Sequence, residues 1–449
     1  MKSSELLEVA ERVLADAKPG EEMEVVASWS LDTEVRAYGG EVEHLVSADS
    51  AGVGVRILVD GRQGTAWVGG LEEASLRACV ADARDNTRFA SPDPFAGLAV
   101  PDGHPIEGLE LFDDRLLAES TESKIALALD LERRIMERDP RIVGIESADY
   151  ADSISAGAIV STTGIRAFSS ETSTYLGAYV LAGDDAETTS GFGFSVGRRG
   201  EDLSAETAAT DAVEKAIAAL GATKVPSQRL TVVFDPYVTS QFISLVAEML
   251  AGDAVIRGRS PFADRLGDQV SSSLLTLFDD AINPLSPTSS EIDGEGLACR
   301  RVPLIDAGVL AGFMHNSYSA RSAGAVSTGS AQRSSLQSPP SVGPFVITAT
   351  PGERTHGDIV AAVGEGVLVR ELSGLHSGVN TISGDLSVGI EGLMIRGGEP
   401  AESVAEVTVA STIQRMLNDI VMIGSDLTYF PWEATGVTMA IGDMALSGK

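Results

Sequence analysis

The chain has few cysteines and no long apolar run, and both absences limit the class of protein that it can belong to. Cys79 and Cys299 are the only cysteines among 449 residues, too few for a disulfide framework, so a reducing compartment is the better expectation. No apolar run approaches the roughly 20 residues that cross a bilayer, and the N-terminal segment MKSSELLEVAERVLADAKPG lacks the apolar stretch of a secretory signal. We therefore predict a soluble cytoplasmic protein that does not insert into membranes.

Basic residues are also scarce. The sequence has 33 Lys and Arg against 65 Asp and Glu, a formal net charge of -32, with no local basic run. Such a chain repels phosphate backbones, which argues against direct nucleic-acid binding. Its 43% hydrophobic and 22% charged residues are ordinary for a globular protein, and the length favours two domains of roughly 200 residues each.

Histidine is rare enough to consider residue by residue. The five are His44, His104, His315, His356 and His376. None is followed by a second His or Cys at a metal-ligand spacing, so structural roles are favoured over metal binding. The chain is rich in serine, but no G-x-S-x-G elbow accompanies it. His315 and His376 lie in polar segments that could face a cleft, the alternative being that these residues only fix turns.

The N-terminal half shows the same order of elements twice. Amphipathic helices are predicted over about 4–17, 71–88, 121–138 and 204–220, with extended segments at 24–68 and 142–196 between them. Turns are expected at Gly39-Gly40, Asp49-Ser50, Asp60-Gly61, Thr163-Gly164 and Gly183-Asp184. We predict an internal duplication, 1–88 and 118–221, joined by a proline-containing surface connection over 89–114.

Glycines alternate along Gly191-Phe192-Gly193-Phe194-Ser195-Val196-Gly197. A phosphate-binding loop would open a helix, whereas this pattern lies within a predicted strand. We expect these glycines to permit close approach of another backbone or a bulge.

The C-terminal half has a different pattern of predicted elements, with short strands and few helices. Short strands are predicted at 299–305, 309–314, 345–349, 367–371 and 404–409, with helices at 236–251 and about 412–421 and a mobile loop at 324–343. The fold class is therefore α+β. A duplicated helix, β-meander and helix domain (1–221) is followed by a linker (222–229) and a mainly-β domain with a curved or barrel-like sheet and covering helices (230–449).

Four C-terminal segments carry a family resemblance. They read FADRLGDQV (262–270), DGEGLACRRVPLIDAGVLAGFMHNSYSARSAGAVSTGSAQR (from Asp293), SGVNTISGDLSVGIEGLMIRGGE (377–399) and VAEVTVASTIQRMLNDIVMIGSDL (404–427). In this order they resemble the C-terminal core of the TldD/PmbA family of metalloprotease-related proteins. They span most of the C-terminal half, although Gly343-Pro344-Phe345 and Ala410-Ser411-Thr412 replace segments where the family often has asparagine.

The family that the chain resembles has two branches. TldD-type members carry a zinc motif, HExxxH, on the helix that corresponds to 236–251, and a later cysteine ligand. Alignment on Gly252-Asp253 places Ile243 and Ser244 at the first His and the Glu, and Glu248 at the second His. No histidine lies between His104 and His315, and no cysteine follows Cys299. The chain is thus similar to the PmbA (TldE) branch, which lacks the motif.

The resemblance implies a non-catalytic subunit, with no metal of its own, paired with a TldD-like zinc protease that cleaves unfolded peptides or peptide precursors. We expect His315, Asn316, Tyr318 and Arg321 to contact substrate. Two alternatives stay open: a self-sufficient peptidase with an unrecognised site, and a homodimeric, non-proteolytic peptide-binding protein.

Overall fold

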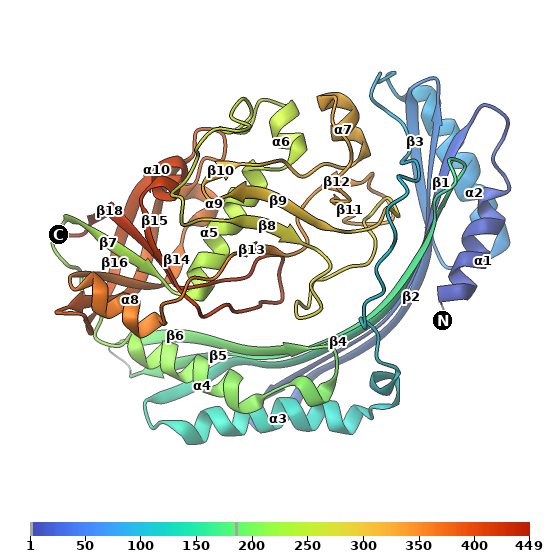
Figure 1. The fold of residues 1–449 in the computed structure, drawn as a ribbon. Helices are drawn as coiled ribbons and strands as arrows, with labels where there is room; N and C mark the ends of the chain where they lie inside the picture. Colours follow the sequence, from blue (N-terminus) through green and yellow to red (C-terminus); the bar gives the residue numbers. More distant parts are fainter. Residues whose placement is uncertain (1–2, 185–186) are drawn as a thin grey trace.

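A single curved sheet organises the first half of the chain. The computed structural model describes residues 3–184 and 187–449. Six antiparallel strands run in the order β3-β2-β1-β4-β5-β6. The sheet wraps around the C-terminal half, and its helices cover the opposite, convex face (Figure 1). The elements are α1 (Ser3–Leu14), β1 (Glu22–Tyr38), β2 (Glu41–Val59), β3 (Arg62–Gly69), α2 (Glu73–Asn86), α3 (Thr121–Arg138), β4 (Ile142–Ser161), β5 (Arg166–Gly183), β6 (Thr188–Gly197) and α4 (Ala205–Ala218).

Side chains alternate between the two faces of this sheet, as a strand period of two requires. On β1, Val25, Ala27 and Trp29 pack against α1 and α2, whereas Val26 joins a small cluster with Leu297 of the C-terminal half. The concave face is thereby presented to the second half of the chain.

One expected turn is wrong. Asp49 and Ser50 lie inside β2, where Asp49 pairs with Leu31 and Ser50 with Ser30. The Asp49 carboxylate accepts a hydrogen bond of 2.7 Å from the indole nitrogen of Trp29. A polar dipeptide therefore continues the strand because its neighbour on β1 satisfies it.

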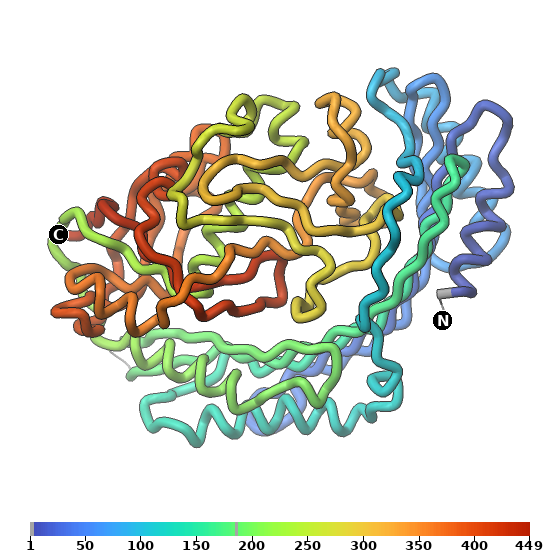
Figure 2. Tube along the Cα trace, in the orientation of Figure 1, coloured from blue at the N-terminus to red at the C-terminus, as the bar shows by residue number. Residues whose placement is uncertain are grey.

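The two helix and strand units share this sheet through the pairing of β1 with β4. The connection between them has two short 3₁₀ turns, Thr87–Phe89 and Asp114–Ala118, and otherwise follows the edge of the C-terminal half (Figure 2). The duplication and the domain boundaries stay predictions.

Gly191 and Gly193 let α4 lie directly on β6. A Cβ built on Gly193 would collide with the carbonyl oxygen of Ala208 and lie 2.5 Å from the amide nitrogen of Ala212. A Cβ on Gly191 would collide with the backbone of Ala212 and Ala216 in the same way. The alternating glycines thus permit close helix packing, as their pattern indicates.

Gly193→Ala is accordingly expected to lower the free energy of unfolding by about 1–3 kcal/mol, because α4 must move off the sheet to admit a methyl group. Gly144→Ala is the matched control, since nothing lies within 4 Å of a Cβ at that position of β4. Urea unfolding of both variants measures the difference. Equal costs would contradict the packing explanation.

The C-terminal half is built on a closed ring of five strands. They run β16-β15-β14-β7-β18, and β18 returns to pair with β16, while β17 extends the sheet from β18. A second sheet has the order β10-β9-β8-β13. The strands are β7 (Gln228–Phe234), β8 (Leu277–Asp280), β9 (Arg301–Asp306), β10 (Val309–Leu310), β13 (Ile347–Ala349), β14 (Gly366–Ser373), β15 (Asp385–Arg396), β16 (Glu399–Thr412), β17 (Ile420–Ile423) and β18 (Met439–Ser447).

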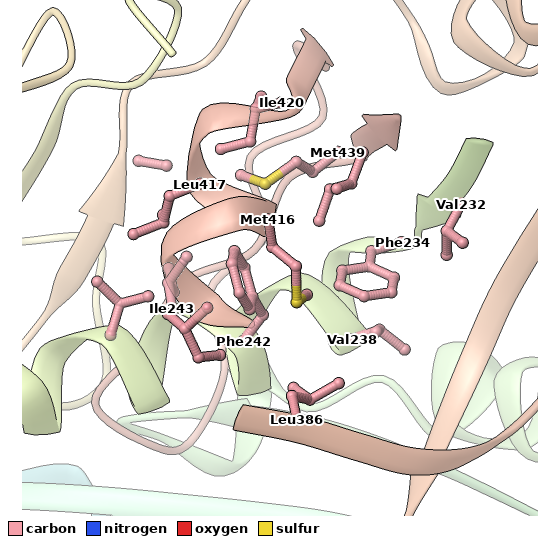
Figure 3. Packing of buried hydrophobic residues seen from close by; sticks show 14 of the residues in the cluster. Val232, Phe234, Val238, Phe242, Ile243, Leu386, Met416, Leu417, Ile420 and Met439 are labelled. Carbon is pink, nitrogen blue, oxygen red and sulfur yellow. The ribbon is translucent and has the colours of Figure 1, made fainter. Parts of the chain in front are cut away.

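Helix α5 (Pro236–Met249) lies in the core between these sheets. Phe242 and Ile243 pack with Phe234, Leu386 and Met416 (Figure 3). The other helices are α6 (Gly252–Ile256), α7 (Ser317–Ala323), α8 (His356–Val363), α9 (Leu375–Gly378) and α10 (Ile413–Asn418). Among the described residues, no helix is both long and apolar enough to cross a membrane.

The serine-rich segment 324–343 packs better than its composition predicts. Ser330 and Ala331 are buried, and β11 (Ala331–Gln332) pairs with β12 (Ser341–Val342). The Arg333 guanidinium, which donates to the carbonyl oxygens of Gly294 and Ser338, holds the segment in place. Gln332 and Arg333 of this segment line the cleft between the two halves of the chain.

Candidate functional site

A cleft of about 750 Å³ separates the concave face of the curved sheet from the C-terminal half. Its floor is formed by β1, β4, β5 and β6, and its roof by loops of the second half. The floor includes Ser28, Asp32 and Glu34 of β1, Ala151 and Ser153 of β4, and Ser169, Glu171, Ser173 and Tyr175 of β5; the roof includes residues 287–290, Asp293, Gln332, Arg333, Phe345, Pro431 and Glu433.

Strand alternation explains why the floor is polar. On β5 the residues between the floor positions, such as Thr172 and Leu176, are buried on the helix side, whereas Ser173 and Glu171 are exposed in the cleft. The small side chains leave room above the backbone. Ser30 and Ser153 each donate a hydrogen bond to the Asp32 carboxylate, at 2.8 and 2.6 Å.

Carboxylates dominate the charge of the cleft. Asp32, Glu34, Glu171 and Glu433 line it, and the cation Arg333 already pairs with Glu24. Although Glu171 is exposed to solvent within the cleft, the protein atoms packed around it partly desolvate its carboxylate and raise its pKa, and the opposing influence of Arg198 and Ser155 does not cancel that effect. Hydroxyl and carboxylate groups in such a cleft can accept hydrogen bonds from amide N–H groups and from cationic side chains.

A buried ion triad holds the roof to the floor. Glu24 on β1 is only 2% exposed and accepts hydrogen bonds from Arg56 on β2, at 3.1 and 2.8 Å. Arg333 reaches the same carboxylate at 2.6 Å from the C-terminal half. Burial alone would raise the pKa of Glu24, but the charges and hydrogen bonds of the two arginines outweigh it and lower that pKa. The triad fixes the loop that contains Arg333 against the sheet.

The predicted substrate contacts lie elsewhere. His315 is buried, its Nδ1 lies 3.0 Å from Ser319 Oγ, and burial lowers its pKa. Asn316 caps α7 by accepting a hydrogen bond from the Ser319 amide. None of the four residues, His315, Asn316, Tyr318 and Arg321, lines the cleft.

Tyr318 and Arg321 bind the connection 89–114. The Tyr318 hydroxyl donates to Asp93 at 3.0 Å, and the Arg321 guanidinium donates to the carbonyl oxygens of Phe95, Gly97 and Leu98. Arg321 also lines a separate hollow of about 590 Å³ with Val100 and Asp102. A substrate-binding role for these residues stays a prediction.

The three positions aligned with the zinc motif do not converge. Ile243 is 1% exposed and has no donor atom, Ser244 donates its hydroxyl to the carbonyl oxygen of Ser240 at 2.9 Å, and Glu248 is exposed to solvent. These side chains do not fit a zinc site. Within residues 3–184 and 187–449, no cluster of three or more His, Cys, Asp or Glu side chains is placed to hold a metal ion.

The substrate contacts predicted from the sequence do not include the residues that line the cleft. The signal was available on β5, where Ser169, Glu171, Ser173 and Tyr175 follow a period of two. What the sequence did not reveal is that loops of the second half cover this face.

Comparisons with known proteins agree with this architecture. Family models described as PmbA/TldA metallopeptidase match residues 23–87 (domain 1), 114–220 (central domain) and 227–448 (C-terminal domain). Metalloprotease PmbA of Escherichia coli O157:H7 is 26% identical over 408 residues, covering 90% of this chain and 87% of that protein.

A metalloprotease TldD homolog of Haemophilus influenzae is 26% identical over 336 residues, covering 72% of this chain and 69% of that protein. The crystal structure of TldE from Thermococcus kodakarensis superposes with a TM-score of 0.88 at 21% identity, covering 99% of both chains. That likeness shows a shared fold along the whole chain.

Proposed function

From the premise that this chain belongs to the PmbA/TldD metallopeptidase family, we propose that it is a TldE-type, non-catalytic subunit. It acts in the cytoplasm with a TldD-like zinc protease, as a heterodimer, on unfolded peptides or peptide precursors. The zinc and the hydrolytic chemistry belong to the partner. This chain supplies part of the wall that holds the substrate.

The state of α5 is the observation that carries the proposal. The helix is packed in the core, and Ile243, which the resemblance aligns with the first motif histidine, is a buried aliphatic side chain there. A metal ion there would need a nitrogen, oxygen or sulfur ligand. Retaining the fold without the ligands is what a substrate-holding subunit requires.

The cleft supports the peptide part of the proposal. Its floor is a strand surface with hydroxyl acceptors, and its acidic lining favours peptides that carry Lys or Arg. A folded protein presents too few free backbone groups to use such a surface. We therefore expect unfolded, basic peptides to bind best.

Co-expression with a TldD-like subunit tests the proposal. We expect a stable complex with about one zinc ion, bound by the partner, and cleavage of unfolded peptide by the complex. The isolated chain is expected to bind no stoichiometric zinc and to cleave nothing. Metal analysis of each subunit and a peptide cleavage assay provide the measurements.

The matched control is a complex whose TldD-like subunit carries Glu→Gln in its own zinc motif, which keeps the assembly and removes the proton acceptor. Stoichiometric zinc on this chain alone would overturn the proposal. Cleavage by the isolated chain would favour a self-sufficient peptidase, and a stable homodimer that ignores the partner would favour a peptide-binding protein.

A further inference from the structure

The first part of β2 is a free sheet edge. β2 pairs with β1 from Glu41 to Leu58, but β3 covers its other side only from Gly52 to Val59. Among the described residues, no strand or loop makes a backbone hydrogen bond to the outer side of 41–50. An edge of this kind presents a row of N–H and C=O groups that can pair with another strand.

An apolar groove adjoins the start of this edge. It has a volume of about 640 Å³ and lies between the β1–β2 turn, α3 and the beginning of β4, with Tyr38, Leu129, Met136 and Ile145 among its lining residues. Tyr38 is 56% exposed and Met136 47%, and Leu45 on the edge strand itself is 45% exposed. Clustered apolar exposure beside a free edge is typical of a protein interface.

The charge of the edge decides which partner fits. Residues 41–50 contain Glu41, Glu43 and Asp49 and no Lys or Arg. Two copies paired edge to edge would bring six carboxylates onto adjacent strands, between chains that each carry a formal charge of -32. Like charges across paired strands are destabilising, whereas a strand with Lys or Arg gains opposite-charge pairs.

We propose that this free edge of β2, residues 41–50, together with the adjoining apolar groove, is the docking surface for a strand of the partner subunit that carries Lys or Arg. The inference rests on the proposed function and deepens it by naming the surface. An apolar side chain of the partner fills the groove beside Tyr38. The acidic edge opposes self-pairing and so selects a heterodimer.

Hydrogen exchange of the backbone amides tests the surface directly. In the isolated chain, the outward-facing amides of 41–50 exchange fast, and in the complex with a TldD-like subunit they become protected. If the complex forms and these amides stay unprotected, the docking surface is wrong while the proposed function survives. If no complex forms, the proposed function fails as well. A homodimer that protects 41–50 would overturn the choice of partner.

Charge reversal gives the second measurement. Glu41→Lys with Glu43→Lys is expected to raise the dissociation constant of the complex about tenfold, with the difference shrinking at high salt. Glu8→Lys with Glu122→Lys, at exposed positions of α1 and α3, makes the same change of net charge away from the edge. Equal weakening by the two double variants would mean that only net charge matters and would overturn the proposal.

Discussion

Glu24→Ala is expected to lower the free energy of unfolding by about 3–5 kcal/mol, because it leaves two guanidinium groups buried without their counterion. Arg56 is 6% exposed, and both it and Arg333 direct hydrogen bonds at this one carboxylate. Chemical denaturation at neutral pH measures the loss. Because Arg333 comes from the C-terminal half, the variant should also loosen the roof of the cleft.

An exposed ion pair provides the control. Asp149→Ala removes the partner of Arg36, whose side chain is 47% exposed, and should cost about 0–1 kcal/mol. Glu24→Gln keeps the shape and one acceptor oxygen, so its cost should fall between the two. A cost for Glu24→Ala below that of Asp149→Ala would refute the role given to the triad.

The pH dependence has a definite sign. The pKa of Glu24 is lowered from its ordinary 4.5 in the folded protein, so the carboxylate stabilises the fold above that value. This stabilisation is lost as the pH falls through the folded pKa. The difference between the parent protein and Glu24→Ala should therefore be constant near neutrality and shrink in acid.

If the proposed function holds, Ser173→Trp is expected to reduce peptide cleavage by the complex at least about tenfold without disturbing the fold, because the indole would fill part of the cleft proposed to hold the substrate. Ser173 is exposed on the cleft floor, directly opposite Ser153 on the neighbouring strand. Steady-state cleavage of an unfolded basic peptide and the unfolding midpoint of the variant are the measurements.

Ser91→Trp is the matched control, since Ser91 is exposed on the connection and lies outside the cleft. It should leave cleavage unchanged. If Ser173→Trp folds, forms the complex and cleaves at the parental rate, the substrate does not pass through this cleft. A partner that cleaves equally well without this chain would lead to the same conclusion.

Much of the N-terminal half could be predicted because its signals are local. Helix α3 spans 121–138 as its periodicity predicts, and four of the five expected turns lie at the ends of strands β1, β2, β4 and β5. The turn predicted at Asp49-Ser50 is wrong because the hydrogen bond that keeps this dipeptide extended comes from Trp29 on another strand. In the C-terminal half, β18 was missed because it pairs with β7, far away in the sequence, whereas β15 was missed although its partner β16 follows it directly.

The candidate site was predictable only in part. The resemblance led to α5, whose Ile243 lies in the core between the helix and the surrounding strands. Polar residues of 315–321 looked available for substrate because nothing in the sequence shows that Arg321 binds the carbonyl groups of 95–98. The cleft itself arises only when the two halves meet.

The closed ring of five strands has a consequence for synthesis on the ribosome. Its two neighbouring strands β7 and β18 are joined by a hydrogen bond from Arg229 to Asp443, which spans 214 residues. The curved sheet, made of two three-stranded meanders joined by the pairing of β1 with β4, can form while the chain is still emerging, whereas the ring stays open at β7 until β18 has been translated. Until then β7 offers an unpaired edge to other nascent chains, so chaperones should engage this protein before β18 has emerged and paired.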